Sequence, residues 1–202
     1  MTPQDFQRAV QIGDAQLARL QIYADLLLKW QAKINLVGPD TLPDVWSRHM
    51  LDSAQLAPYI PHGAKVADLG SGAGFPGLVL AILRDDLDVH LVESDQRKCA
   101  FLREVNRATQ AKASIHNTRI EALGSLQADV VTSRALAGLD KLLEFADIHR
   151  LSTGKCLFPK GKRWAEELTA AQKAWKMAAL QHPSRTEPAG RVLELLEINR
   201  KI

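Results

Sequence analysis

Apolar side chains recur at helical spacing near the start of the chain. Within residues 14–35 they occupy every third or fourth position, at Leu17, Leu20, Tyr23, Leu27, Trp30 and Ile34. This spacing predicts an amphipathic helix, which Asp14 can cap. Pro39 and Pro43 then break the chain, and a shorter helical pattern covers residues 44–60 before Pro61 and Gly63 end it. We expect residues 1–62 to form a helical segment that packs on the rest of the protein.

Beyond residue 63 short apolar runs alternate with longer helical patterns. The runs that predict strands cover residues 65–69, 88–93, 113–117, 128–134 and 154–159. The patterns that predict helices cover residues 77–83, 96–110, 139–151 and 163–177. Two last strands, 179–184 and 190–200, flank a turn that contains Pro188 and Gly190. This order predicts an α/β domain over residues 63–202, with a mostly parallel sheet, helices on both faces and an antiparallel C-terminal hairpin.

Composition narrows the class of protein. Of the 202 residues, 46% are hydrophobic and 24% are charged, as in ordinary globular proteins. No apolar run approaches the about 20 residues that span a bilayer, and the first residues lack the order of a secretion signal. We therefore expect a cytoplasmic protein with no membrane partner. Cys99 and Cys156 have no spacing typical of a disulfide framework or a metal site, and we expect both to be buried as small apolar side chains.

The net charge of +3 is mildly basic, and the basic residues are unevenly distributed. One set comprises Lys155, Lys160, Lys162 and Arg163. A second set comprises Arg97, Lys98, Arg103 and Arg107. Each set is either part of a nucleic-acid-binding surface or the solvated face of a helix.

The segment "DLGSGAGFPG", residues 68–77, joins the first predicted strand to a helix. Its glycines let the chain turn sharply and let a ligand approach the backbone. Pro76 suits the first turn of the helix, where its missing N–H group costs nothing. Counted from Gly72, the segment has the G-x-G-x-x-G pattern of dinucleotide-binding loops. Counted from Asp68, it has the D-x-G-x-G-x-G pattern of methyltransferases that use S-adenosylmethionine.

Two carboxylates help to choose between these cofactors. Glu93 ends the next strand, roughly 20 residues after the loop, where it can accept both hydroxyls of a nucleoside ribose. Its alternative role is to cap the helix that begins near Gln96. Asp68 puts a carboxylate beside the loop, which disfavours a pyrophosphate and suits a sulfonium and an ammonium group. The pattern therefore favours S-adenosylmethionine over NAD, with contacts at Asp68, Gly70, Gly72, Gly74 and Glu93.

Five segments follow one another in the order "NLVGP…WSRHMLDS", "DLGSGAGFPGLVLAI", "LVESDQRKCAFLREV", "VVTSRALAGL" and "FPKGK". Together they resemble the RsmG or GidB family of bacterial 16S rRNA (guanine-N7)-methyltransferases, over nearly the whole chain. Many methyltransferases share the glycine loop, whereas "RHMLDS" and "SRA" are specific to this family.

The resemblance implies a Rossmann-like class I methyltransferase fold with a seven-stranded sheet. It implies S-adenosylmethionine as cofactor, no metal, and methylation of N7 of a guanine in the decoding-region loop of 16S rRNA, within the small ribosomal subunit. By position it implies cofactor contacts at Gly70, Phe75, Ile120, Glu121 and Arg134, besides Glu93. We expect the enzyme to be a monomer.

Guanine N7 carries an in-plane lone pair and no proton, so it can attack the methyl carbon of a sulfonium without a general base. Catalysis then depends on in-line positioning and electrostatics. After the fourth strand the chain has "SRAL" rather than the Asn/Asp-Pro-Pro-aromatic motif of many exocyclic-amine methyltransferases. Neither cysteine follows a proline, as the nucleophiles of pyrimidine C5 methylation often do. We expect Arg134 to hold the guanine O6 or an RNA phosphate, or else to form an ion pair with a nearby carboxylate.

Polar residues outside the loop are candidates for RNA contacts, and they are Asn35, Arg48, His49, Lys160, Lys162 and Arg163. Arg48 and Asp52 stand at i and i+4 of a short helix, where they can form an ion pair. His49 and Asp52 either latch the N-terminal helices to the sheet or belong to a lid that touches RNA. Asn35 either contacts RNA or caps the preceding helix, and Lys160 is expected to contact a phosphate.

Two alternative functions stay open from the sequence. One is a methyltransferase of the same fold with a different nucleic-acid or protein target. The other is a non-catalytic ribosome-assembly factor that keeps the cofactor pocket.

Overall fold

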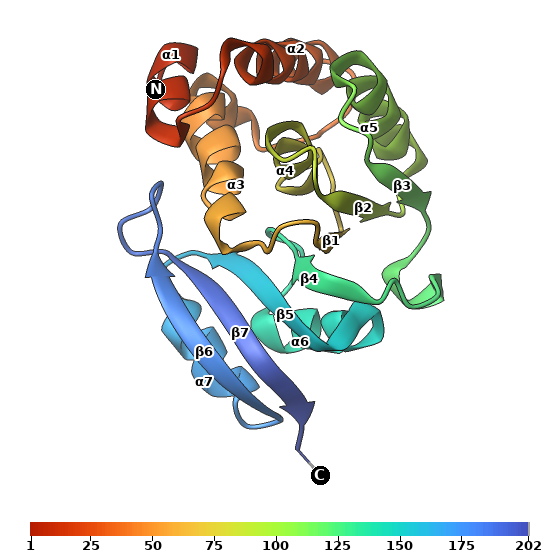
Figure 1. Ribbon diagram of the computed structural model, residues 1–202, viewed down its shortest axis with the longest axis vertical. Helices are drawn as coiled ribbons and strands as arrows, with labels where there is room; N and C mark the ends of the chain where they lie inside the picture. The colour runs from red at the N-terminus through yellow and green to blue at the C-terminus, as the bar shows by residue number, and fades with distance from the viewer. Residues whose placement is uncertain (202) are drawn as a thin grey trace.

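The computed structural model describes residues 1–201, and its centre is a seven-stranded sheet (Figure 1). The strands lie in the order β3-β2-β1-β4-β5-β7-β6. Their bounds are β1 Lys65–Leu69, β2 Asp88–Glu93, β3 Ser114–Asn117, β4 Ala128–Thr132, β5 Arg150–Lys160, β6 Trp175–Pro183 and β7 Arg191–Arg200. Strands β1 to β5 pair in parallel, and β7 pairs antiparallel with both β5 and β6. The predicted mostly parallel sheet with an antiparallel C-terminal hairpin is confirmed.

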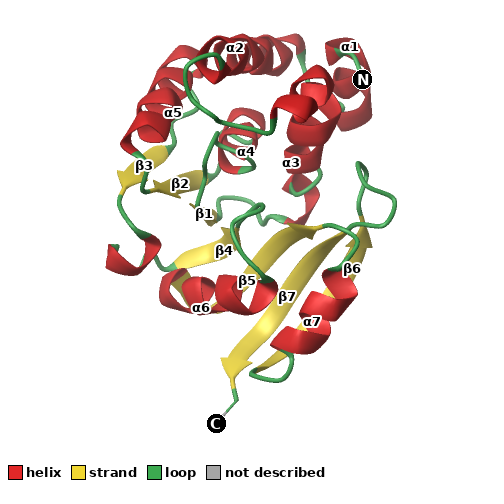
Figure 2. Ribbon diagram, turned by 180° about the vertical axis from the view of Figure 1, so that it is seen from behind, coloured by secondary structure: helices red, strands yellow, loops and turns green. Residues whose placement is uncertain are grey.

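Helices cover both faces of this sheet (Figures 1 and 2). The longer helices are α1 Pro3–Val10, α2 Asp14–Gln31, α4 Gly77–Leu83, α5 Gln96–Thr109, α6 Leu139–His149 and α7 Trp164–Ala171. The short helical segments are η1 Pro39–Asp44, η2 Trp46–Leu51, α3 Asp52–Ala54, η3 Ala57–Tyr59 and η4 Ile120–Ala122. The N-terminal helices, α4 and α5 pack on one face, and α6 and α7 pack on the other.

Neighbouring residues of each central strand point to opposite faces. Val66 and Val130 belong to the core under α4 and α5, whereas Ala67 and Val131 belong to the core under α6 and α7. Because both faces are buried, these strands are largely apolar on both sides, which is why the sequence predicts them well. Cys99 and Cys156 are free and buried, as expected.

The predicted helix at residues 163–177 is too long. Helix α7 ends at Ala171, the chain turns, and Trp175 begins β6. The indole N–H group of Trp175 donates to Asp140 Oδ1 at 3.0 Å, and the side chain is 2% exposed. Burial of a large aromatic ring between α6 and the sheet overrides the local helical pattern.

The helical pattern at residues 44–60 is broken into η2, α3 and η3 in the structure. Segment η2 is a wide π-helical turn, and π-helical turns are frequent at functional sites. Within residues 1–201, no helix combines the length and the apolar character that a membrane crossing needs.

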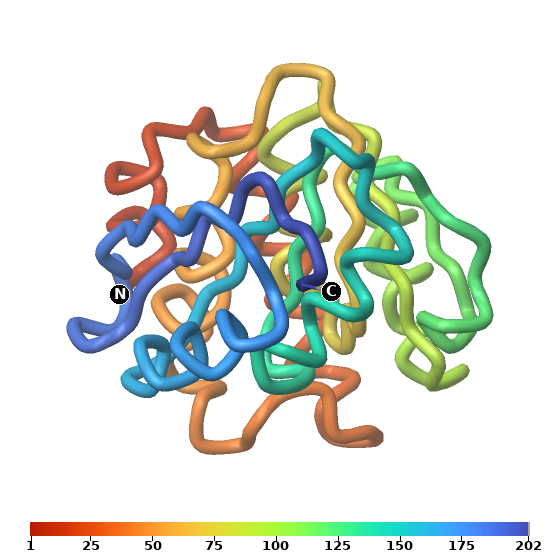
Figure 3. Tube along the Cα trace, turned by 90° about the horizontal axis from the view of Figure 1, so that it is seen from below, coloured from red at the N-terminus to blue at the C-terminus, as the bar shows by residue number. Residues whose placement is uncertain are grey.

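The turn between β6 and β7 reaches the N-terminal helices. Figures 1 and 3 show the blue hairpin beside the red N-terminal segment, and the Arg185 side chain donates a hydrogen bond to Ala9 O at 2.8 Å. Arg185 N donates to the Gln55 side chain at 2.9 Å. These contacts bring residues 184–187 next to η2 and α3, which lie more than 100 residues earlier in the sequence.

Candidate functional site

A cavity of about 1200 Å³ opens at the carboxyl ends of β1, β2 and β4. It lies where the strand order reverses between β1 and β4, which is the place where open α/β sheets bind ligands. Its walls come from the loops after these strands, from η1 and η2, from the segment after β5 and from the β6–β7 turn.

The glycine loop forms one wall of this cavity. Gly70 and Gly72 have positive φ angles of 69° and 57°, which glycine adopts without strain. The Gly70 and Ser71 N–H groups donate to Val92 O at 2.9 and 3.0 Å, so the loop is tied to the end of β2. Gly70 and Gly72 both line the cavity, and their contacts with the cofactor stay a prediction.

Glu93 lies beside this loop and lines the cavity. Its Oε2 accepts from Gly72 N at 2.9 Å, and its Oε1 accepts from Asp95 N at 2.8 Å. The alternative role as a helix cap falls instead to Asp95, whose Oδ1 accepts from Arg97 N and Lys98 N. Each oxygen of Glu93 keeps further acceptor capacity, so the carboxylate can still receive hydroxyl groups from a ligand.

Asp68 does not lie where the sequence suggested. Its side chain is fully buried beneath the loop and does not line the cavity. Oδ2 accepts from Gly77 N at 3.0 Å at the start of α4, and Oδ1 has no hydrogen-bond partner among the described residues. Burial raises the pKa of this carboxyl to about 7. Asp68 thus shapes the loop from below rather than facing a sulfonium group.

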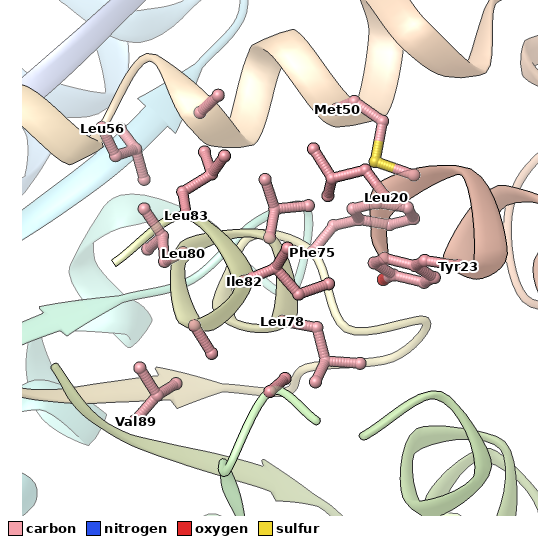
Figure 4. Close-up of a cluster of buried hydrophobic side chains, with 14 of the residues drawn as sticks. Leu20, Tyr23, Met50, Leu56, Phe75, Leu78, Leu80, Ile82, Leu83 and Val89 are labelled. Atoms are coloured by element: carbon pink, nitrogen blue, oxygen red, sulfur yellow. The ribbon is translucent and has the colours of Figure 1, made fainter. Parts of the chain in front are cut away.

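Gly74 and Phe75 are held by α2. A side chain at Gly74 would collide with Leu78 and the Tyr23 hydroxyl. Gly74 therefore packs against the core and does not line the cavity. The Phe75 ring stacks on the Tyr23 ring (Figure 4), and the two ring centroids are 5.1 Å apart. The Tyr23 hydroxyl donates to Ala73 O. Phe75 itself lines the cavity, and its contact with the cofactor stays a prediction.

Ile120 and Glu121 line the cavity at η4, on the side of the loop after β3. Ile120 is 8% exposed and supplies an apolar surface, and its carbonyl oxygen lies 2.9 Å from His149 Nε2. Glu121 is exposed at the rim. Both residues thus line the cavity, and the cofactor contacts that the resemblance implies for them stay a prediction.

Arg134 lies on the opposite wall, where it contacts η2. Its Nη2 lies 2.8 Å from His49 Nδ1, and its Nη1 donates to Arg48 O at 3.0 Å. Nη1 also lies 3.5 Å from Asp52 Oδ2, so the ion pair left open by the sequence is formed. The guanidinium carbon lies 4.9 Å from the centre of the Phe75 ring.

The predicted Arg48–Asp52 ion pair is wrong. Arg48 lies 3.7 Å from Glu187 Oε2, and Asp52 Oδ1 instead accepts from the Thr186 hydroxyl at 2.7 Å. The two side chains diverge because η2 is a wide turn, so residues four apart no longer lie above one another. Arg48 and His49 both line the cavity.

The basic residues after β5 lie in different surroundings. Lys160 lines the cavity, but its side chain is 9% exposed and its Nζ donates to Glu167 at 2.8 Å and to Ala137 O at 3.1 Å. Arg163 lines the cavity from an exposed position, whereas Lys162 is exposed outside the lining. A phosphate contact by Lys160 stays a prediction, and it requires competition with Glu167.

Asn35 lines a separate pocket of about 420 Å³ between the end of α2 and the start of α5. Gln31, rather than Asn35, bonds the backbone after α2, because its side chain accepts from Leu36 N and Val37 N. The pocket also contains Lys33, Arg97 and Lys98, and Lys98 lines the large cavity as well.

Several lining residues have no signal in the sequence. Ser184, Thr186 and Glu187 reach the cavity from the β6–β7 turn, and Thr41 reaches it from η1. Leu136 covers Gly70 and is 40% exposed. These positions depend on how distant segments pack together, which local spacing does not encode.

The residues present fit S-adenosylmethionine. The cavity offers exposed loop backbone at Gly70 and Gly72, an acceptor carboxylate at Glu93 and an apolar surface at Ile120. Over residues 1–201, His, Cys, Asp and Glu side chains form no group of three or more that could hold a metal ion.

Comparisons with known proteins agree with the resemblance. The family "GidB: rRNA small subunit methyltransferase G" matches residues 16–191. The ribosomal RNA small subunit methyltransferase G of Paramagnetospirillum magneticum is 57% identical over 201 residues, or 99% of this chain and 98% of that protein. The protein of the same name from Rhodospirillum centenum is 53% identical and covers 96% of this chain and 90% of its own.

Solved structures agree on the fold. TYW2 from M. jannaschii in complex with AdoMet has a TM-score of 0.59 at 15% identity, over 84% of this chain and 80% of its own. A TehB-like SAM-dependent methyltransferase from Corynebacterium glutamicum also has a TM-score of 0.59, at 14% identity, over 87% of this chain and 98% of its own. The fold is that of class I methyltransferases. Given the family match over most of its length, the chain belongs to the GidB family of rRNA small subunit methyltransferase G proteins.

Proposed function

We propose that this protein transfers a methyl group from S-adenosylmethionine to N7 of a guanine in the decoding-region loop of 16S rRNA. Membership of the GidB family supports an rRNA methyltransferase that uses this cofactor. The observation that carries the proposal is that one large cavity has the glycine loop and Glu93 on one wall and Arg134 on the opposite wall. The cofactor and the target base must meet between these walls.

Glu93 and the glycine loop hold the cofactor in this proposal. Glu93 accepts the ribose hydroxyls while its two backbone hydrogen bonds keep the loop and the start of α5 in place. Ile120 and Glu121 lie on the adenine side. When bound, S-adenosylmethionine supplies an electrophilic methyl group on a sulfonium.

No residue needs to remove a proton, because guanine N7 has none. The polar groups near Arg134 are consistent with such a reaction. Burial and the charges of Arg134 and Arg48 lower the pKa of His49 to about 3, and both ring nitrogens lie within hydrogen-bond distance of protein groups. A histidine in this state is a poor general base. Arg134 orients the target by donating to O6 of the guanine or to a phosphate.

The test is to digest 16S rRNA from a strain with the gene and from a strain without it, and to map 7-methylguanosine by mass spectrometry. We expect one site to be lost without the gene and restored by the wild-type protein but not by Arg134→Ala. Identical rRNA in both strains overturns the proposal. Purified enzyme offered small subunits and naked 16S rRNA in parallel then identifies which form is the substrate.

A further inference from the structure

Arg134 is held mainly by η2, with Asp52 at the start of α3 as a further partner 3.5 Å from its Nη1. The guanidinium approaches His49 Nδ1 at 2.8 Å and Arg48 O at 3.0 Å, and it lies over the Phe75 ring. Its Nε–H group has no hydrogen-bond partner among residues 1–201. The contacts therefore engage the outer nitrogens of the side chain and leave donors for a ligand in the cavity.

The protonation of His49 follows from these contacts. Arginine has donors only, so His49 Nδ1 must accept, and the ring proton must lie on Nε2. Nε2–H then donates to Thr41 Oγ1 at 2.8 Å, and the Thr41 hydroxyl donates to Gly38 O at 2.6 Å. Burial and the nearby Arg134 and Arg48 charges lower the pKa of His49 to about 3, so the ring stays neutral at neutral pH.

The His49 ring is also fixed by packing. It stacks on the Phe75 ring with centroids 5.0 Å apart, on the wall of the cavity. Phe75 in turn stacks on Tyr23, whose hydroxyl bonds Ala73 O in the glycine loop. His49 therefore connects the position of Arg134 to the loop that holds the cofactor.

We propose that His49 is a positioning residue, which holds the Arg134 guanidinium through its Nδ1 atom so that the free N–H groups of Arg134 orient the RNA target. This inference rests on the proposed function, in which Arg134 contacts that target. A direct RNA contact by His49 is disfavoured, because both ring nitrogens are already engaged. A purely structural latch would depend on the bond to Thr41 rather than on the bond to Arg134.

The two bonds can be separated with a matched pair of variants. In His49→Asn, Oδ1 takes the place of Nδ1 and can still accept from Arg134, but the donor to Thr41 is lost. In His49→Gln, the amide reaches Thr41 but the acceptor near Arg134 is lost. The measurement is the single-turnover rate of methyl transfer to small subunits that lack the modification, together with S-adenosylhomocysteine affinity by calorimetry and Tm.

We expect His49→Gln to lower the single-turnover rate about 10- to 100-fold, as for the loss of a hydrogen bond to a charged group, with the cofactor Kd changed less than about threefold. His49→Asn should recover most of that rate. In the double variant His49→Gln/Arg134→Lys the loss should be no greater than in Arg134→Lys alone, because both changes disrupt one interaction.

Three results overturn the inference. They are equal rates for the Asn and Gln variants, a better rate for Gln than for Asn, and multiplying losses in the double variant. An inactive wild-type enzyme on these subunits would instead contradict the proposed function. The Tm and the S-adenosylhomocysteine affinity identify a variant that fails to fold, because such a variant has a lowered Tm and also loses cofactor binding.

Discussion

At the scale of single residues, one carboxylate joins two parts of the site. Glu93 bonds the glycine loop through Gly72 N and the start of α5 through Asp95 N, and it also faces the cavity. Its position at the end of β2 was predictable, because a strand end with an acid about 20 residues after a glycine loop is a recurrent arrangement. Its two backbone partners were not, because they depend on the fold of the loop.

We expect Glu93→Ala to weaken S-adenosylhomocysteine binding about 10- to 100-fold, since in the proposed function the carboxylate bonds the ligand as well as the loop. Glu93→Gln keeps one acceptor oxygen and should lose less. Calorimetry with S-adenosylhomocysteine measures both. The affinity for RNA should change less than about threefold, and equal losses for the two ligands would argue against a ribose contact.

Asp68 should make stability depend on pH. Its pKa of about 7 in the folded protein is above the ordinary value of 3.8, so the folded state retains a proton that the unfolded chain has released. The free energy of unfolding therefore falls as pH rises from about 4 to about 7, by up to about 1.4 kcal/mol per pH unit from this group. Below about pH 4 ionisation of Asp68 causes no loss in the free energy of unfolding, and above about pH 7 the loss has reached its full size.

Asp68→Asn removes this titration. Urea unfolding of the wild type and of the variant at several pH values between 4 and 8 measures the difference. We expect the variant to gain on the wild type as pH rises through this window and the difference to level off above about pH 7. A difference that is constant with pH would show that Asp68 titrates normally. The direction of this buried side chain was not predictable, because sequence spacing cannot say which side of a loop a carboxyl faces.

At the scale of elements, the central strands and the glycine loop were predictable, whereas the end of helix α7 and the wide turn η2 were not. Strand β1 and helix α4 have the predicted bounds, because both are short, largely apolar runs next to glycine or proline. Helix α7 is shorter than its pattern, because Trp175 is buried against Asp140 and starts a strand. The wide turn η2 was also missed, since helical spacing cannot distinguish it from an α-helix over so few residues.

The start of α4 gives a test of loop packing. A methyl group at Gly77 would lie 2.3 Å from Leu91 Cδ2 and 2.7 Å from Asp68 Oδ2, both buried. We expect Gly77→Ala to lower the free energy of unfolding by about 1–3 kcal/mol through overpacking. Gly124→Ala is the matched control, because a methyl group there meets nothing within 4 Å. Urea unfolding of both variants checks this, and equal stabilities would mean that the contact around Gly77 relaxes freely.

At the scale of the whole molecule, the cavity is assembled from both ends of the chain. Thr186 on the β6–β7 turn donates to Asp52 Oδ1, and Asp52 lies beside Arg134. The sequence predicted the hairpin but not its role in the cavity wall. The position of its turn depends on the order β5-β7-β6 and on contacts with the N-terminal helices. Such contacts join segments that are distant in the sequence, so local sequence patterns do not predict them.

The modest net charge of +3 hides a local concentration of basic groups next to the cavity. Lys33, Arg97 and Lys98 line the small pocket between α2 and α5, and none of them forms an ion pair within the described part of the chain. Lys98 also lines the large cavity, so the two hollows adjoin. A strand of RNA whose target base enters the large cavity could place its neighbouring phosphates here.

We therefore expect the double variant Lys33→Ala/Arg97→Ala to bind RNA more weakly and with a shallower dependence on salt. Each lost phosphate contact lowers the slope of log K against log salt concentration by about 0.7–0.9. Filter binding of a 16S rRNA fragment at several salt concentrations measures the slope. The control Lys173→Ala/Lys176→Ala removes the same charge from exposed positions that line neither cavity, and it should leave the slope nearly unchanged. Equal slopes for the two double variants would mean that net charge alone, and not this pocket, attracts the RNA.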